Sequence, residues 1–168
     1  MLRSEVMLVE ATPHPEPLPL DCVPSLQDAP SLGVFAVAHT VHPSETSALV
    51  PHANNVVILG WIDLVASLHG AAAGAPRDQL AREGRMWFVA RHEIEYLGEA
   101  FVGDRIVVAT WVETLGRTSL VRATRILRDD GKLLTRATSR WALVDLASRR
   151  PVAIPEPVRT GLVGNRGQ

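Results

Sequence analysis

The chain has 168 residues, a length that allows one domain with a substantial hydrophobic core. Hydrophobic residues make up 46% of it and charged residues 21%, as in ordinary globular proteins. The net charge of −1 gives no reason to expect nucleic acid or an anionic membrane as a partner. No apolar run approaches the roughly 20 residues that span a bilayer. We therefore expect a cytoplasmic protein.

Cysteine and histidine give no sign of a metal or a cofactor. Cys22 is the only cysteine, which excludes an intrachain disulfide and a cysteine-based metal site. No basic neighbour would favour its thiolate, so we interpret it as a passive side chain. His39, His42 and His92 lack the spacing of metal ligands.

Residues 1–32 differ in composition from the rest of the chain. They hold half of its 12 prolines, and this spacing favours an extended path and excludes a helix. We expect an arm that is either disordered or draped on the domain. The sequence thus divides into a proline-rich arm at 1–32, a domain at 33–158 and a C-terminal tail at 159–168.

A strand, a loop and a long helix are predicted next. Residues 33–42 are β-rich, and residues 43–51 form a loop with a proline at each end. A helix should run from about residue 54 to residue 69, because four apolar residues share one face, namely Ile58, Ile62, Val65 and Ala66. Gly60 costs about 1 kcal/mol relative to alanine inside a helix. We therefore expect another backbone to approach it closely.

The second half of the chain reads as a short polar segment at 76–84 followed by four strands. The strands are expected at 86–97, 104–115, 118–128 and 133–145. Gly131 supplies the positive φ of a hairpin turn between the last two. One helix against about five strands in consecutive antiparallel connections predicts an α+β fold with a single domain.

The polar entrance of the long helix is the first candidate site. His52, Asn54 and Asn55 precede the apolar residues, and asparagine is a good N-cap. A helix N-terminus presents unpaired N–H groups and the positive end of the dipole, so it can hold an anion or polarise a carbonyl oxygen.

Several runs of residues resemble hotdog-fold acyl thioesterases, both the plant-type acyl-ACP enzymes and the 4-hydroxybenzoyl-CoA thioesterase-like group. The run HANNVVILGWI at 52–62 resembles the helix entrance of that family. IEYLGEA at 94–100 resembles its second strand. RWALVD at 140–145 and RPVAIP at 150–155 resemble its last strand and tail. The resemblance covers residues 33–158.

The resemblance implies a helix wrapped by a curved sheet and a thioester held in a tunnel between two subunits. It implies hydrolysis of an acyl-CoA, or of a fatty acyl or polyketide chain on an acyl carrier protein, by a homodimer or tetramer. The carbonyl would be polarised at the helix N-terminus, and a carboxylate in the preceding loop or on the helix would attack or activate water.

The sequence departs from the family at this acid. Alignment on His52 places the expected aspartate at Ala48 and an accompanying asparagine at Val50. The acid has moved to Glu45 or Asp63, or a water is held without one by the polar entrance. The catalytic candidates are therefore Glu45, His52, Asn54, Asn55 and Asp63.

Five residues are candidates for substrate binding. Arg117, Thr118 and Ser119 fall where related enzymes approach pantetheine and nucleotide, and a solvated strand end is the alternative. Tyr96 and Trp61 complete the set. The tryptophans are otherwise read as packing residues, of which one or two line the tunnel: Trp61, Trp87, Trp111 and Trp141.

Three arginines, Arg122, Arg125 and Arg128, lie within one predicted strand. We interpret them as a polar outer face of the sheet. The alternative is a surface that attracts an acidic acyl carrier protein.

Two other functions remain open. A hotdog dehydratase or hydratase would act on a β-hydroxyacyl or enoyl thioester, although the usual His-to-Pro-Gly loop of those enzymes is missing here. A non-catalytic acyl-binding protein would explain the missing aspartate.

Overall fold

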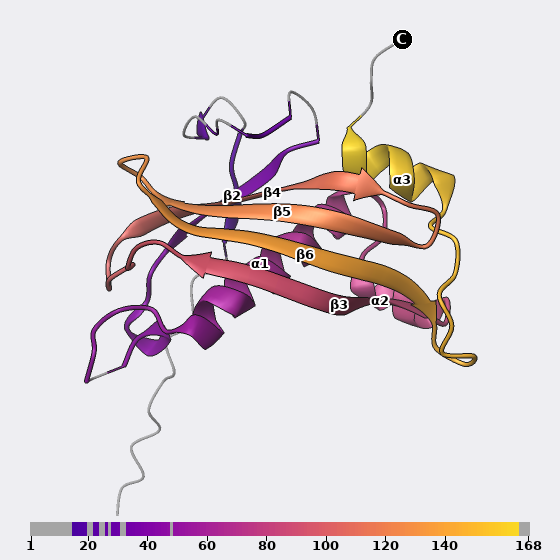
Figure 1. Ribbon diagram of the computed structural model, residues 1–168, viewed down its shortest axis with the longest axis horizontal. Coiled ribbons are helices and arrows are strands. Elements are labelled where there is room, and N and C mark those ends of the chain that lie inside the picture. Colours follow the sequence, from indigo (N-terminus) through magenta and orange to yellow (C-terminus); the bar gives the residue numbers. More distant parts are fainter. Residues whose placement is uncertain are drawn as a thin grey trace, which may run out of the picture.

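One long helix lies across one face of a curved antiparallel sheet (Figure 1). The computed structural model describes residues 15–19, 22–23, 26, 28–30, 33–47 and 49–164. The long helix, α1, spans Asn55–Ala72, three residues further than predicted. The predicted α+β class is confirmed.

The sheet has six strands in the order β1-β2-β4-β5-β6-β3, and every neighbouring pair is antiparallel. The strands are β1 Glu16–Pro17, β2 Phe35–Thr40, β3 Arg85–Tyr96, β4 Arg105–Leu115, β5 Ser119–Arg128 and β6 Leu133–Asp145. The count exceeds the predicted five because β1, within the proline-rich arm, pairs with β2. Bulges in β3, β4 and β6 interrupt the register, and such bulges bend strands.

The prediction that all four later strands follow one another in the sheet is wrong for β3. This strand pairs with β6, whereas β4 lies between β2 and β5. The chain crosses from one edge of the sheet to its interior between Tyr96 and Arg105. Alternation along a strand shows which face is buried but does not identify the neighbouring strand.

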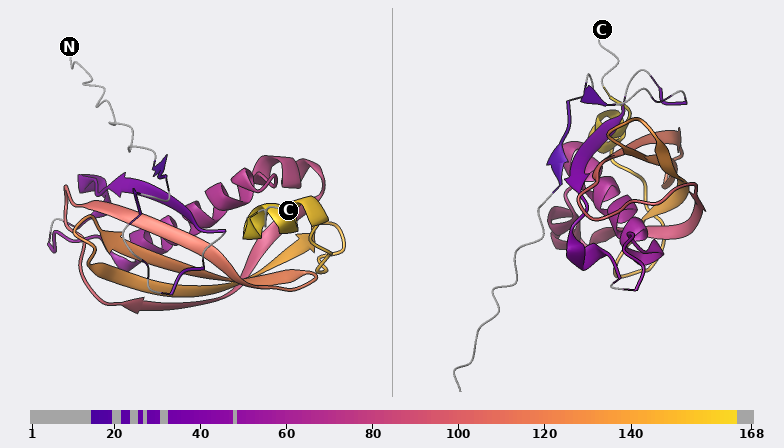
Figure 2. Two further views of the ribbon diagram at one scale, coloured as in Figure 1. Left: turned by 90° about the horizontal axis from the view of Figure 1, so that it is seen from above. Right: turned by 90° about the vertical axis from the view of Figure 1, so that its left-hand side faces the viewer.

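Three shorter helical segments follow β2 in the described part of the chain. They are a 3-10 turn at Pro43–Glu45 (η2), α2 at Arg77–Arg82 and α3 at Glu156–Val163. Helix α2 lies in the segment predicted only as polar. Helix α3 crosses the predicted boundary between domain and tail, and it lies on the same side of the sheet as α1 (Figure 2). A Cβ at Gly161 would lie 2.8 Å from the Ala73 backbone, so this glycine permits the close contact with the end of α1.

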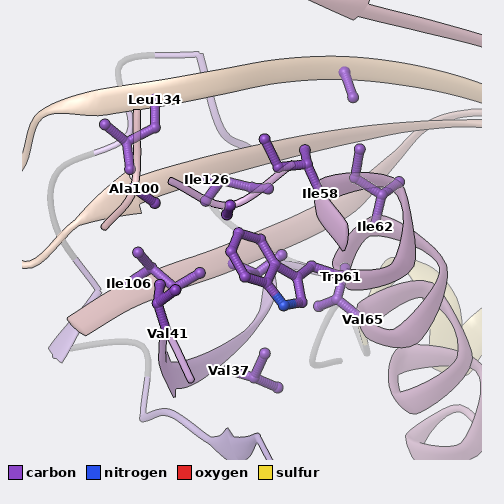
Figure 3. Close-up of a cluster of buried hydrophobic side chains, with 13 residues drawn as sticks. Val37, Val41, Ile58, Trp61, Ile62, Val65, Ala100, Ile106, Ile126 and Leu134 are labelled. Atoms are coloured by element: carbon purple, nitrogen blue, oxygen red, sulfur yellow. The ribbon is translucent and has the colours of Figure 1, made fainter. Parts of the chain in front are cut away.

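The main core lies between α1 and the sheet. Figure 3 shows Trp61 at the centre of this cluster, among side chains from β2, β4 and β5. Ile62 and Val65 of α1 are completely buried. Trp61, Trp111 and Trp141 are buried, as expected for packing residues, and Trp87 is half-buried.

Gly60 does not have the predicted close neighbour. It is exposed, and no atom of the described chain lies within 4 Å of the position that a Cβ would occupy. Gly60 lies on the opposite side of α1 from Ile62, on a face that the sheet does not cover.

The prediction of a polar outer face for three arginines is also wrong. Arg122 is 4% exposed and faces α1, whereas Arg125 is 5% exposed and lies on the other face of the sheet. Residues three apart on a strand point to opposite faces. Arg128 is half-buried at the hairpin beside Asp130.

The described part of the proline-rich arm lies on the sheet. Leu18, Val23 and Leu26 pack against the face that is turned away from α1, and Asp28 pairs with Arg125. Cys22 is exposed. Residues 1–14 and the chain end at 165–168 lie outside the described residues.

Helix α1 is apolar on nearly all sides. By length and composition it could cross a membrane, with a mean hydropathy of 1.4 over 18 residues, but core helices of soluble proteins pass the same test. Only 39% of this helix is buried within the chain. Exposed apolar surface of this kind is typical of interaction sites in proteins.

A buried polar pair joins the end of α1 to the sheet and should make the fold sensitive to mild acid. The Arg122 guanidinium donates to Nδ1 of His69 at 2.7 Å, and burial, with the Arg122 charge, lowers the pKa of His69 to about 3. The unfolded chain binds a proton at this histidine below its usual pKa of 6.5, and the folded chain does not. The free energy of unfolding should therefore decrease as the pH is lowered below 6.5, by up to about 1.4 kcal/mol for each pH unit.

His69→Gln, which keeps an acceptor for Arg122, should flatten this slope between pH 6.5 and 5. Urea unfolding of both proteins from pH 7.5 to pH 5 measures it. The slope should not vanish, because burial also lowers the pKa of His92. Identical slopes in the two proteins would contradict the prediction.

Candidate functional site

The entrance of α1 is held in place by the segment that follows β3. The Ala53 N–H donates to the Ala100 carbonyl at 2.8 Å, and His52 forms a β-bridge with Phe101. This segment also makes the crossing from β3 to β4. The helix entrance is therefore fixed at the end of the sheet where β3 ends.

Asn54 caps α1 and leaves two N–H groups without a partner. Its side-chain oxygen accepts from the Val57 N–H at 3.0 Å, which confirms the predicted capping. The Asn55 and Val56 N–H groups precede the first intrahelical bond and have no acceptor among the described residues. They lie in an open depression lined by residues of the entrance, namely His52, Asn54, Asn55, Val56 and Val57.

His52 has a partner at the entrance that the sequence did not suggest. Its Nδ1 lies 2.6 Å from Oε1 of Glu99, a residue 47 positions away. The carboxylate holds the proton on Nδ1 and leaves Nε2 as an acceptor. The His52 side chain is 32% exposed, so water can reach it. Glu99 lies within a run that resembles the family, but no local pattern could reveal a pairing over this distance.

Glu45 lies beneath the entrance, and all its hydrogen-bonding capacity is used. Its carboxylate accepts from the Trp61 indole at 2.9 Å, from the His42 N–H at 2.7 Å and from His39 at 2.8 Å. The side chain is only 13% exposed. Burial raises the pKa of Glu45, but hydrogen bonds from His42, His39 and Trp61 outweigh it and the pKa is lowered. The carboxylate thus stays charged and joins β2, the η2 turn and α1.

Asp63 lies farther along the helix and is paired with Arg77. The guanidinium makes two hydrogen bonds to the carboxylate, at 2.7 and 3.0 Å, and the Asp63 side chain is 44% exposed. Asp63 is eight residues beyond Asn55, which places it about 12 Å along the helix axis. A single chain therefore cannot bring Asp63 to a carbonyl bound at its own helix entrance.

The substrate-binding candidates divide between the two ends of the sheet. Tyr96 is 45% exposed and ends β3 close to the helix entrance, and Trp61 is buried against Glu45. Arg117, Thr118 and Ser119 lie at the start of β5. The other end of β5, which pairs with β4 near the crossing segment and the helix entrance, is about 30 Å away. One chain thus does not bring these three residues to its own entrance.

Apolar side chains surround the polar entrance. Val56 is 77% exposed, and Phe101 and Val102 are 41% and 45% exposed. In the loop before the helix, Leu49 is 92% exposed. Ala48, where the resemblance would place an aspartate, lies outside the described residues. Donors surrounded by exposed apolar groups suit a ligand with one polar group and a hydrocarbon part.

No cluster of three or more His, Cys, Asp or Glu side chains suitable for a metal occurs in the part of the chain that the structure describes. What the entrance provides is a pair of N–H donors, a histidine oriented by a carboxylate and an apolar surround. This combination can bind a carbonyl oxygen and accept a proton from water.

Several known proteins that are similar to this chain in sequence or fold are thioesterases. A chloroplastic acyl-[acyl-carrier-protein] hydrolase of Cuphea viscosissima is 34% identical over 86 residues, which are 51% of this chain and 21% of that protein. The chain thus spans about one fifth of the length of this curated relative. The fold of this chain is similar to that of a 1,4-dihydroxy-2-naphthoyl-CoA thioesterase from Synechocystis. The TM-score is 0.71 at 16% identity, with coverage of 77% of this chain and 95% of the other.

A protein from Staphylococcus aureus that was crystallised with CoA has a TM-score of 0.74 at 18% identity, with coverage of 80% of this chain and 85% of the other. Residues 41–162, which include the entrance, all of β3 to β6 and most of α3, match the Thioesterase-like superfamily. The chain therefore belongs to the Thioesterase-like superfamily, and its α1 and curved sheet form a hotdog-fold domain.

Proposed function

We propose that the protein hydrolyses an acyl thioester at the entrance of α1. The observation that carries the proposal is the pair of unpartnered N–H groups at Asn55 and Val56 beside the His52–Glu99 pair. Membership of the Thioesterase-like superfamily supports the reaction class.

The two N–H groups would bind the carbonyl oxygen of the thioester. When water attacks the carbonyl carbon, negative charge develops on this oxygen, and donors already in position at a helix N-terminus stabilise it. Because the helix is capped by Asn54 and fixed by Ala100, the donors need not reorganise during the reaction. The thiolate of the carrier then leaves as the tetrahedral intermediate collapses.

His52 is the group that one chain brings to the entrance to activate water. Glu99 holds its Nδ1 proton, so Nε2 can take a proton from water and return it to the departing thiolate. Glu45 lacks a free acceptor position, and we assign it the role of fixing the entrance on the sheet. Asn54 caps the helix, and Asn55 supplies its backbone N–H.

Asp63 is the alternative base, and it requires a second copy of the chain. Strand β3 pairs on one side only and its residues are mostly exposed, so it is an open edge 12 residues long. Unpaired edges of this length are normally covered, and α1 also has apolar surface to bury. We propose a homodimer, or a tetramer of such dimers, joined along β3.

In an antiparallel β3–β3 pair the two chains run in opposite directions. Each entrance would then face the middle or far end of the partner, where Asp63 and Arg117–Ser119 lie. This arrangement would allow Asp63 to reach a carbonyl held by the other copy and the basic strand end to contact its carrier. The carrier is CoA or an acyl carrier protein, as in the activities of the relatives named above, and the acyl chain is of the fatty or polyketide class.

Release of free thiol from a panel of acyl-CoA and acyl-carrier thioesters tests the reaction. Absorbance change on an enoyl thioester without thiol release would favour a dehydratase or hydratase. Tight binding without turnover would favour an acyl-binding protein.

Asn55→Pro should abolish most activity without harming the fold. Asn55 is the first residue of α1, where proline fits, and Asn54 already has the extended backbone that precedes proline, with φ −78° and ψ 165°. The change deletes one N–H donor and should lower kcat by roughly a hundredfold. Asn55→Ala keeps the N–H and should retain activity within a few-fold. Equal kcat values for the two variants would contradict the oxyanion role.

His52 and Asp63 can be ranked as bases by matched substitutions. With His52 as the base, His52→Ala should lower kcat by about 100-fold or more, and Glu99→Gln should lower it less. Asp63→Asn and Arg77→Met, which both remove the same ion pair, should then have equally small effects. If Asp63→Asn alone is severely impaired, Asp63 is the base. Restored activity on mixing Asp63→Asn with Asn55→Pro subunits would place it in the partner.

Glu45→Gln should reduce stability more than activity. The amide cannot accept from every donor that the carboxylate satisfies, so the unfolding free energy at pH 7 should fall by about 1–3 kcal/mol. Because the pKa of Glu45 is lowered in the folded state, this advantage of the native protein should shrink as pH falls below its usual 4.5. Urea unfolding measures both, with exposed Glu113→Gln as the control. A large loss of kcat at unchanged stability would instead make Glu45 catalytic.

A further inference from the structure

A narrow cavity lies between the second half of α1, helix α2 and the sheet. The volume that the centre of a water-sized sphere can occupy is about 20 Å³, which is room for one small polar group, and the wider unfilled space of about 350 Å³ includes open solvent. Its walls are mostly apolar and include Ala66, Gly70, Trp87, Leu120 and Leu162. Among the other lining residues, Arg122 and Trp141 have side-chain nitrogens that are buried and have no partner among the described residues.

Arg122 is a buried cation whose partners are all neutral. The side chain donates to His69 at 2.7 Å and to the Thr110 hydroxyl at 3.3 Å, and Nε has no acceptor. Burial lowers the pKa of Arg122 to about 10, so it remains charged at neutral pH, while His69 is uncharged. No carboxylate in the described ranges contacts it. A buried charge without a counter-charge costs several kcal/mol.

Arg125 shows how this fold treats a buried arginine that only supports structure. It lies on the same strand but on the opposite face of the sheet, where it pairs with the Asp28 carboxylate. It also donates to the carbonyls of Thr124 and Ala137 and lies 5.2 Å from the Trp111 ring centre. Arg122 has no comparable set of partners, so a structural role does not account for its charge.

Trp141 provides a second donor on the same face of the sheet. Its indole N–H is buried and has no acceptor among the described residues. Arg122 lies opposite Ser139 in the β5–β6 pair, and Leu120 lies opposite Trp141, so the two donors are diagonal neighbours. Both side chains line the one cavity. An orphaned charged donor and an orphaned neutral donor at one cavity point to an oxygen acceptor that carries negative charge.

We propose that the cavity binds a carboxylate at the far end of a short acyl chain, held by Arg122 and the Trp141 indole. The preferred substrate would then be the monothioester of a dicarboxylic acid. This inference rests on the proposed thioester hydrolysis. Arg77 lines the cavity and also holds Asp63, so the cavity adjoins the part of α1 that would face the partner's entrance. Ser67, another lining residue, is four residues beyond Asp63, about 6 Å along the helix.

Binding of non-hydrolysable thioether analogues tests the cavity independently of turnover. The probes are CoA thioethers with acyl chains of four to six carbons, each made with and without a terminal carboxylate. Calorimetric titration of the native protein should show a preference for the carboxylated member of at least one pair, by roughly tenfold or more. Arg122→Met should remove this preference, and Trp141→Phe, which deletes the N–H and replaces the indole by a smaller aromatic ring, should reduce it.

Arg125→Met is the matched control, since it removes a buried arginine from the same strand on the opposite face. It should leave the preference intact. Equal binding of charged and uncharged chains by the native protein would overturn the inference, as would a preference that survives in Trp141→Phe and Arg122→Met. Failure of every carboxylated analogue to bind would also overturn it.

The two proposals can fail separately. Hydrolysis of acyl thioesters without any preference for a terminal carboxylate would leave the proposed function standing and refute the carboxylate site. A binding preference for the carboxylated analogues, with no thiol release from any thioester, would support the carboxylate site and refute the proposed hydrolysis. Trp141→Phe alone decides the matter if Arg122→Met does not fold, because it keeps an aromatic ring beside His92 and leaves the Arg122 charge in place.

Discussion

The packing of α1 on the curved sheet is the contact on which the other features depend. Ile62 and Val65 are completely buried there, and each such side chain contributes about 1.5–3 kcal/mol. This contact fixes where the helix begins relative to the sheet, and so where its free N–H groups lie. It also leaves the opposite face of the helix, at Gly60 and Val56, uncovered. The same helix therefore forms the core and supplies the surface of the candidate site.

Polar contacts locate α1 at both ends, in two different ways. Near its start, Trp61 donates to the Glu45 carboxylate, which also accepts from His39 and from the His42 N–H, whereas Nδ1 of His39 has no partner among the described residues. Near its end, His69 meets Arg122, where donors remain and the charge is not compensated. A buried carboxylate with three donors is stabilised, whereas a buried guanidinium with only neutral partners costs free energy. We therefore read the first as structural and the second as functional.

Local patterns in the sequence predicted the elements and the helix cap but not the contacts between distant residues. The four long strands, the Gly131 turn and the Asn54 cap each depend on residues close in sequence, and the structure confirms them. The pairing of β3 with β6 depends on the crossing of the chain, and the Glu99 partner of His52 depends on that crossing too. The arginine face was misread because a three-residue spacing suits a helix, whereas strand faces alternate every two residues. The catalytic candidates themselves stay predictions.

The distances along α1 support the proposal that two copies of the chain combine around one substrate. The N–H donors lie at residues 55 and 56, the Asp63 carboxylate about 12 Å further on and the Arg122 cavity beyond that. One short acyl thioester cannot contact its own helix entrance and this cavity together. Two antiparallel helices, joined through the open β3 edge, would place the entrance of one copy beside the cavity of the other. The uncovered helix face, the unpaired strand and the separated polar groups thus have one common explanation.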